Sequence, residues 1–253
     1  MHRFYVPADR ISGDQVSFEA GQRRQMRSVL RLRPGDFVAL LDGSGREYKV
    51  QIEILDDTQA LGRILEAAEP AVESEVHLTL VQGLPKGEKI DLILQKCTEI
   101  GVAEFLVAET ARSVPRIPSG KMHSRLERWR AIAREAAEQS GRTRLPAVSG
   151  VIPFADALSR TRDTDARIIA WEEEEELSLP SMLPSLAGAR RIAYFVGPEG
   201  GFTAEEVAAA RAEGITAVSL GPRVLRTETA AIAGTALIIY GLEKLGETID
   251  HRQ

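Results

Sequence analysis

The C-terminal part of the chain holds two apolar runs of strand length, and each run ends in a glycine loop that leads to a helix pattern. The first run, residues 192–196, is followed by GPEGG at 197–201, and the sequence from Thr203 has the form of a helix capping box. The second run, residues 215–220, is followed by GPRVLR at 221–226 and then by small and apolar residues. This alternation predicts an α/β fold, in which ligands lie beyond the carboxyl ends of parallel strands.

The spacing of the glycines limits the kind of ligand. A dinucleotide fingerprint needs GxGxxG with an acidic residue about 20 positions later, and the loop at 197–201 has neither feature. The segment GLPKGEK at 83–89 has the wrong spacing for a phosphate loop, and Glu199 would repel a triphosphate. Either loop alone is more simply a turn. The two loops together, with residues 226–229 between them, favour one site for a less anionic ligand held mostly by main-chain groups.

Six segments along the chain match, in order, the motifs of a known family. They are HRFYV at 2–6, VLRLRPGD at 29–36, LQKCTEIGV at 94–102, EAAEQSGR at 135–142, GPEGGF at 197–202 and SLGPRVLRTETAA at 219–231. Over nearly the whole chain the sequence resembles the RsmE family of the SPOUT methyltransferase superfamily, which methylates N3 of a uridine in small-subunit (16S) ribosomal RNA. The resemblance implies a SPOUT-type parallel sheet with a deep trefoil knot in about residues 191–245, an exception to the rule that chains do not thread loops.

The N-terminal part has a different pattern. Residues 1 to about 70 contain short apolar runs separated by turn signals, with one helix pattern at about 19–30, which favours a small barrel. The resemblance makes residues 1–70 a PUA-like RNA-binding β-barrel. The polar segment 66–75 contains Pro70 and is expected to be a linker. Residues 71–253 then form the methyltransferase domain, where strand patterns near residues 76, 105, 167, 192 and 217 alternate with helices and predict a parallel sheet.

Arginines gather in the helix at 19–30 and just after it. Arg23, Arg24, Arg27, Arg31 and Arg33 lie there, and Arg3 and Arg10 are near in sequence. On the residues alone a solvated helix surface is the simpler interpretation, and the net charge of −5 argues weakly against nucleic acid. The resemblance favours a phosphate-binding face. It also implies that a substrate cleft is lined by Arg112, Glu135, Gln139 and Arg142. The expected RNA-binding residues are therefore Arg3, Arg10, Arg23, Arg24, Arg112, Gln139 and Arg142.

The resemblance implies S-adenosylmethionine as the cofactor, held in the pocket made by the knot. The matched loops supply Gly197, Glu199, Gly200, Gly201, Leu220, Gly221, Leu225 and Arg226, and Trp171 with Glu172 at a strand end are expected to edge the pocket. Main-chain groups would read the adenine while apolar side chains enclose it. No metal site is expected.

The expected chemistry needs a proton acceptor or a stabilising cation, because N3 of uracil carries a proton at neutral pH. Arg226, beside the cofactor, is the choice for stabilising negative charge. Glu228 or Glu135 would take the proton, although a simple ion pair between Glu228 and Arg226 is an equal alternative. The four histidines lie outside the matched loops; they are His2, His77, His123 and His251.

The remaining features bound location and assembly. Cys97 falls on the apolar face of a helix and is interpreted as a core residue, and a single cysteine fits a reducing, cytoplasmic location. Lys96 and Glu99 lie off that face, as a surface ion pair or facing RNA. The helix after Thr229 is implied by the resemblance to form a homodimer that acts on ribosomal RNA or the assembled small ribosomal subunit. An RNA-binding module without catalysis is the alternative function, whereas a nucleotide-dependent dehydrogenase lacks its fingerprint.

Overall fold

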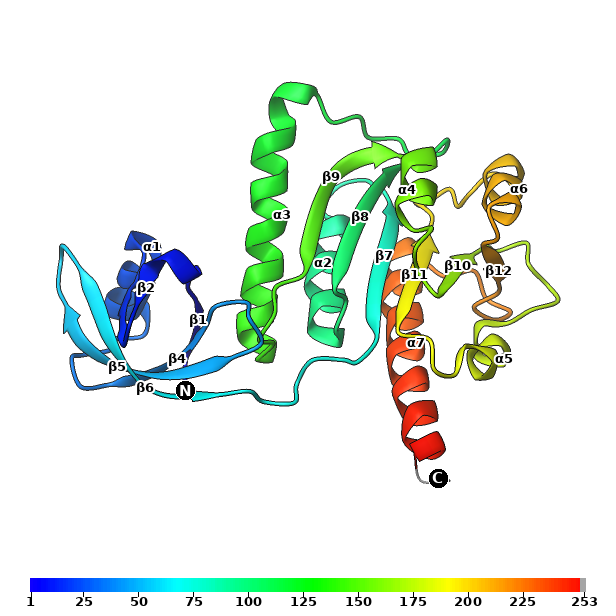
Figure 1. The fold of residues 1–253 in the computed structure, drawn as a ribbon. Coiled ribbons are helices and arrows are strands. Elements are labelled where there is room, and N and C mark those ends of the chain that lie inside the picture. The colour runs from blue at the N-terminus through cyan, green and yellow to red at the C-terminus, as the bar shows by residue number, and fades with distance from the viewer. Residues whose placement is uncertain (251–253) are drawn as a thin grey trace. The chain divides into compact units, whose positions relative to one another are not determined.

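The computed structural model describes residues 1–250, and the side chains of all of these except residues 119 and 245–250. His251 therefore lies outside the described residues. The chain divides into two compact units. The first comprises Met1–Glu73 together with Ala137–Leu145, and the second comprises Ser74–Ala136 together with the chain from Pro146 onward. Figure 1 follows the chain from its blue N-terminal strands to its red C-terminal helix.

The first unit is built on a six-stranded sheet in the order β1-β4-β5-β6-β3-β2. Its strands are β1 (Arg3–Tyr5), β2 (Ile11–Ser12), β3 (Gln15–Ser17), β4 (Phe37–Leu41), β5 (Glu47–Leu55) and β6 (Ala60–Ala68). All neighbours pair antiparallel except β1 and β4, which are parallel. Between β3 and β4 the helix α1 (Ala20–Arg24) continues into a π-helical turn at Gln25–Val29. Alternate residues of the strands, such as Val38, Leu40 and Val50, point into one core with Met26.

A partly buried ion pair joins two segments of the first unit that are distant in sequence. The Glu73 carboxylate accepts hydrogen bonds from Arg142 Nη2 at 2.8 Å and from the backbone N–H groups of Thr143 at 2.8 Å and Arg144 at 3.0 Å. Burial by itself would raise the pKa of Glu73, but these hydrogen bonds and the Arg142 charge hold it below its ordinary value. The Arg142 side chain is only 7% exposed. Arg142 is therefore bound within the first unit, and the RNA contact expected of it stays a prediction.

The second unit is an α/β fold on a six-stranded parallel sheet in the order β12-β10-β11-β7-β8-β9, as the sequence predicts. The strands are β7 (His77–Gly83), β8 (Glu104–Glu109), β9 (Ala147–Pro153), β10 (Ala166–Ala170), β11 (Arg191–Val196) and β12 (Thr216–Val218). The helices are α2 (Lys89–Ile100), α3 (Ser119–Ser140), α4 (Phe154–Arg160), α5 (Leu179–Met182), α6 (Ala204–Ala212) and α7 (Thr227–Asp250). The last turn of α3 belongs to the first unit.

The central strand β11 is buried on both faces, as is usual for a parallel sheet covered by helices. Ile192, Tyr194 and Val196 pack in the core beneath α2 and α7, whereas Ala193 and Phe195 pack in the opposite core with α4 and α6. Cys97 of α2 is buried in the first of these cores, which confirms the interpretation of this residue as a core residue. None of the described helices is long and apolar enough to cross a membrane.

Helix α7 crosses the sheet closely because it carries a glycine over Tyr194. The Tyr194 hydroxyl is fully buried and donates a hydrogen bond to the Ala230 carbonyl at 3.1 Å. A Cβ atom at Gly234 would overlap the hydroxyl and ring of Tyr194. The start of α7, and with it the loop before Thr227, is thus held against β11 by this tyrosine.

We expect Gly234→Ala to destabilise the protein, although the same change in an open helix would stabilise it by up to about 1 kcal/mol. The added methyl group must displace a buried aromatic ring, so the loss in unfolding free energy should be about 1–3 kcal/mol. Thermal unfolding measures it. Gly120→Ala in α3 is the control, because nothing lies within 4 Å of a Cβ atom there. Equal midpoints for the two variants would contradict the close packing of α7.

Candidate functional site

A cavity of about 770 Å³ opens at the carboxyl ends of three neighbouring strands of the second unit. Its walls come from the segments that follow β10, β11 and β12, within residues 170–178, 196–202 and 219–227, together with Lys89 and Ala230. The strands β12, β10 and β11 are adjacent in the sheet, so their carboxyl ends meet at one edge. This is the position at which parallel α/β sheets bind ligands.

The cavity gathers the residues that the sequence predicted to bind a cofactor, apart from Gly200. Those that line it are Trp171, Glu172, Gly197, Glu199, Gly201, Leu220, Gly221, Leu225 and Arg226. Of the predicted catalytic residues, Arg226 lines the cavity, Glu228 lies two residues further on in the first turn of α7, and Glu135 is exposed on α3. Pro198, Phe202, Arg223 and Val224 also line the cavity and were not predicted, although they flank the predicted residues in the same loops.

The loop after β11 is a tight turn that only glycine permits. The Gly201 N–H donates to the Pro198 carbonyl at 2.9 Å, and Gly201 has a φ of +67°. A Cβ atom at Gly197 would lie 2.9 Å from the Gly201 carbonyl carbon. A Cβ atom at Gly83, at the end of β7, would lie 2.6 Å from Pro198 Cδ. The turn thus folds on itself and packs against the end of β7 by close backbone approach.

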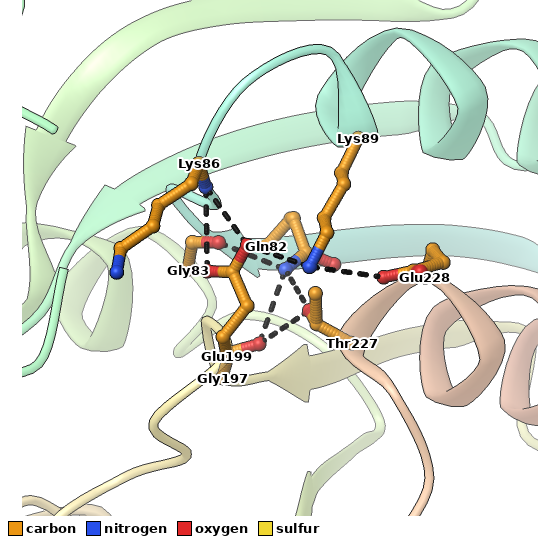
Figure 2. Close-up of polar contacts among 8 residues, drawn as sticks. All are labelled: Gln82, Gly83, Lys86, Lys89, Gly197, Glu199, Thr227 and Glu228. Carbon is orange, nitrogen blue, oxygen red and sulfur yellow. Dashed lines mark hydrogen bonds and ion pairs between the residues drawn. The ribbon is translucent and has the colours of Figure 1, made fainter. Parts of the chain in front are cut away.

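A buried glutamine connects this turn to α7 (Figure 2). Gln82 is fully buried, and its Nε2 donates to Thr227 Oγ1 at 2.9 Å and to the Gly197 carbonyl at 3.3 Å. The Thr227 hydroxyl in turn donates to the Gly197 carbonyl at 2.6 Å. These hydrogen bonds join the ends of β7 and β11 to the first residue of α7. Gln82 was not predicted as a site residue, and its only signal in the sequence is a polar side chain near the end of an apolar strand.

Glu199 in the turn is held by the segment that follows β7 (Figure 2). Its carboxylate accepts from the Lys86 backbone N–H at 3.0 Å, and Lys89 Nζ lies 2.8 Å from Oε1. Burial raises the pKa of Glu199, but the Lys89 hydrogen bond and the backbone N–H groups outweigh it and leave the pKa below its ordinary value. Glu199 is therefore ionised at neutral pH.

Lys89 also faces Glu228, at 3.8 Å from Oε2. This oxygen is buried and has no hydrogen-bond partner among the described residues. Within the part of the chain that the structure describes, Arg226 forms no ion pair with Glu228, so the alternative pairing of these two residues is not found. Arg226 is exposed and lines the cavity.

The part of the lining that follows β10 is acidic and aromatic. Arg211 lies over the Trp171 ring, 5.4 Å from its centroid, and pairs with Glu174. The Glu172 carboxylate lies against Gly201, where a Cβ atom would be 2.8 Å from Oε2. Glu175 and Glu176 also line the cavity, and the apolar lining includes Val196, Phe202, Leu220 and Leu225. This combination suits a ligand with an apolar ring and positive charge, and it disfavours phosphates.

The structure places the predicted RNA-binding residues in varied surroundings. In the first unit Arg3 pairs with Glu47, Arg10 with Glu19, and Arg23 donates to the Thr58 carbonyl at 2.6 Å. Arg24 is exposed, as are Arg31 and Arg33, and none of these three side chains has an ion-pair partner among the described residues. Gln139 is exposed. In the second unit Arg112 Nη1 donates to the Gly200 carbonyl at 2.6 Å, so this side chain supports the glycine turn.

Comparisons with known proteins identify the family of the chain. The family model described as an RNA methyltransferase domain matches residues 72–239, and the one described as an RNA methyltransferase PUA domain matches residues 26–65. The ribosomal RNA small subunit methyltransferase E of Bacillus subtilis is 32% identical over 95% of this chain and 93% of that protein. The Mycobacterium bovis protein of the same name is 35% identical over 90% of this chain and 87% of its own length.

Solved structures extend the likeness to the fold. A ribosomal RNA small subunit methyltransferase E from Neisseria gonorrhoeae, bound to S-adenosyl methionine, has a TM-score of 0.86 and 32% identity over 94% of this chain and 96% of its own. A Legionella pneumophila protein described as a putative methyltransferase, also with the bound cofactor, has a TM-score of 0.85 and 29% identity over 93% of this chain and 96% of its own. On its sequence, its domains and its fold, the chain belongs to the family of ribosomal RNA small subunit methyltransferase E.

Proposed function

We propose that this protein is an S-adenosylmethionine-dependent methyltransferase that modifies N3 of a uridine in small-subunit ribosomal RNA. The observation that carries the proposal is the cavity at the ends of β10, β11 and β12. Its volume of about 770 Å³ falls within the range of about 300–1,000 Å³ typical of cofactor sites. Its apolar lining suits an adenine ring and its carboxylates suit a cationic sulfonium. The cofactor supplies an electrophilic methyl group there.

The cofactor contacts would come from the two glycine loops. The turn at Pro198–Gly201 and the loop at Leu220–Arg226 present main-chain groups to the cavity, where Gly197, Gly201 and Gly221 allow close approach. Trp171 and Glu172 close the other side. We also propose that residues 191–245 form the deep trefoil knot that the resemblance implies. A crystal structure tests the knot. A backbone trace in which this segment does not pass through a loop of the chain would contradict it.

Methylation at N3 requires the loss of a proton, so the chain must stabilise the anion that develops on the uracil. Arg226 suits this role, because it lines the cavity and its guanidinium forms no ion pair with a carboxylate of the described residues. The proton acceptor would be Glu228 or Glu135. Of the two, Glu228 is nearer to Arg226 in sequence and has a buried oxygen without a hydrogen bond.

The first unit, with the PUA domain, is proposed to hold the RNA. Its role follows the expected division into an RNA-binding domain at 1–70 and a methyltransferase domain at 71–253. Arg24, Arg31 and Arg33 are the exposed cations that can contact phosphates without breaking an ion pair. The target base must leave its stack to reach the cavity. The partner is then ribosomal RNA or the assembled small subunit, and the location is cytoplasmic.

A homodimer through α7 is the proposed assembly, with the RNA site built across both chains. Leu237 and Tyr240 are large apolar residues exposed on this helix, 43% and 66% respectively, and such groups are often covered by a partner subunit. Sedimentation at micromolar concentration should show a dimer. A monomer at that concentration would remove the proposal.

The function is tested by cofactor binding and by the product. We expect calorimetry to detect binding of S-adenosylmethionine to the purified protein, and mass mapping to find a methyluridine missing from the small-subunit RNA of a deletion strain. Returning the gene to the deletion strain on a plasmid should restore the methyluridine. Cofactor binding without any methyl transfer to RNA or subunit would favour the RNA-binding alternative without catalysis.

Arg226→Ala should lower turnover about a hundredfold at saturating substrates, the scale observed when one stabilising donor is removed from a reaction site. Arg223→Ala is the matched control, because Arg223 lies in the same loop, lines the same cavity and carries the same charge. We expect the control to keep most of the activity. Wild-type turnover in Arg226→Ala, or equal losses in both variants, would exclude the assigned role.

The RNA-binding face is tested by salt dependence. Removing two cations that bind phosphates with Arg24→Gln/Arg33→Gln should weaken RNA binding. The plot of log affinity against log salt should also become shallower, by roughly 0.7–0.9 for each phosphate that the variant no longer neutralises. The control Arg46→Gln/Arg63→Gln removes two arginines of the same unit that are paired with carboxylates. If Arg24→Gln/Arg33→Gln leaves the salt dependence of RNA affinity unchanged, the RNA does not bind at these arginines.

A further inference from the structure

Lys89 occupies a helix position that disfavours a cation. It is the first residue of α2, where the positive end of the helix dipole favours acidic side chains. Asp91 in the same turn follows that preference, and Lys89 does not. The stability of α2 therefore offers no reason for a lysine here, and the reason has to come from what its side chain contacts.

The contacts of Lys89 lie in two other segments of the chain (Figure 2). Its Nζ atom is 2.8 Å from Glu199 in the glycine turn and 3.8 Å from Glu228 in the first turn of α7. The shorter distance is that of a charge-assisted hydrogen bond, whereas the longer one is an ion pair only. The Lys89 ammonium group thus contacts two carboxylates, and its shorter contact is with Glu199 in the turn.

Glu199 is one of the two central residues of the turn closed by the Gly201 N–H and the Pro198 carbonyl. Its carboxylate is gripped from one side by the Lys86 N–H and Lys89. On the next residue the Gly200 carbonyl accepts from Arg112. Each central residue is therefore bound to a cation from outside the turn.

We propose that Lys89 is a positioning residue for the cofactor. Its ammonium group fixes Glu199 and thereby holds the turn at Pro198–Gly201 in the conformation that receives the cofactor. The proposal rests on the proposed function, because it takes S-adenosylmethionine as the ligand, but it concerns only the residues of this chain that shape the turn.

If Lys89 acted only through its charge, removing it would strengthen the binding of S-adenosylmethionine. The cavity is lined by Glu172, Glu174, Glu175, Glu176 and Glu199, against the cations Lys89, Arg223 and Arg226. Loss of the Lys89 charge would make the cavity more negative, which favours the cationic S-adenosylmethionine over its neutral thioether product, S-adenosylhomocysteine. A role in positioning instead predicts that both ligands bind more weakly and by the same factor, since both need the same turn.

The test compares the affinities of both ligands for Lys89→Met and wild type by calorimetry. Methionine keeps an apolar stem of similar length and removes the ammonium group. We expect both dissociation constants to rise about tenfold, the scale of one charge-assisted hydrogen bond. Lys89→Arg should recover most of the affinity, because a guanidinium can still donate to Glu199. The double variant Lys89→Met/Glu199→Gln should lose less than the product of the two single losses.

Lys96→Met is the matched control. Lys96 lies on the same helix and pairs with Glu99 at 2.9 Å, away from the cavity. We expect it to leave both affinities unchanged, and both methionine variants to unfold at similar temperatures without ligand. Any of three results would overturn the proposal. Lys89→Met could bind S-adenosylmethionine at least as tightly as wild type, the affinity of only one ligand could change, or Lys89→Met could unfold at a much lower temperature than Lys96→Met. Wild-type protein that binds neither ligand would instead contradict the proposed function.

Discussion

The close approach of the turn at Pro198–Gly201 to the end of β7 is the constraint on which the cavity depends. A side chain at Gly83 would strike Pro198, and one at Gly197 would strike the backbone of Gly201. The absence of Cβ atoms at these two positions lets two segments share space that side chains would otherwise fill. The turn can then project past the end of the sheet, so that its main-chain groups form one wall of the cavity.

Polar groups hold this backbone packing in register. Gln82 and Thr227 satisfy the Gly197 carbonyl from inside, and buried hydrogen bonds of this kind specify one arrangement because an unpaired partner is costly. Lys89 and Arg112 grip the turn from outside through Glu199 and the Gly200 carbonyl. The turn is thus held from both sides, and the cavity beside it is lined by several carboxylates.

In the first unit, residue type alone does not reveal the partner of an arginine. Arg142 belongs to a family motif and carries the charge expected of an RNA contact, yet it is buried against Glu73, 69 positions away in sequence. Desolvating an arginine is costly unless a carboxylate and further hydrogen bonds accompany it, and Glu73 supplies the carboxylate. Arg24 and Arg33, with no such partner among the described residues, keep their charge at the surface.

Local pattern was enough to predict the parallel sheet and the two glycine loops, because strand period, glycine and capping signals act over a few neighbouring positions. The cofactor residues that line the cavity were implied by the resemblance to the family, and they make up only part of the lining. The strand β9, AVSGVIP, was missed because Ser149 and Gly150 interrupt its apolar pattern. The partners of the charged and polar residues could not be predicted from the sequence, for a different reason. Gln82 meets Thr227 across 145 positions, and Glu228 meets Lys89 instead of its neighbour Arg226. Such pairs form only when the chain folds back on itself, so tertiary structure alone decides which charge faces the cavity and which is bound within the wall.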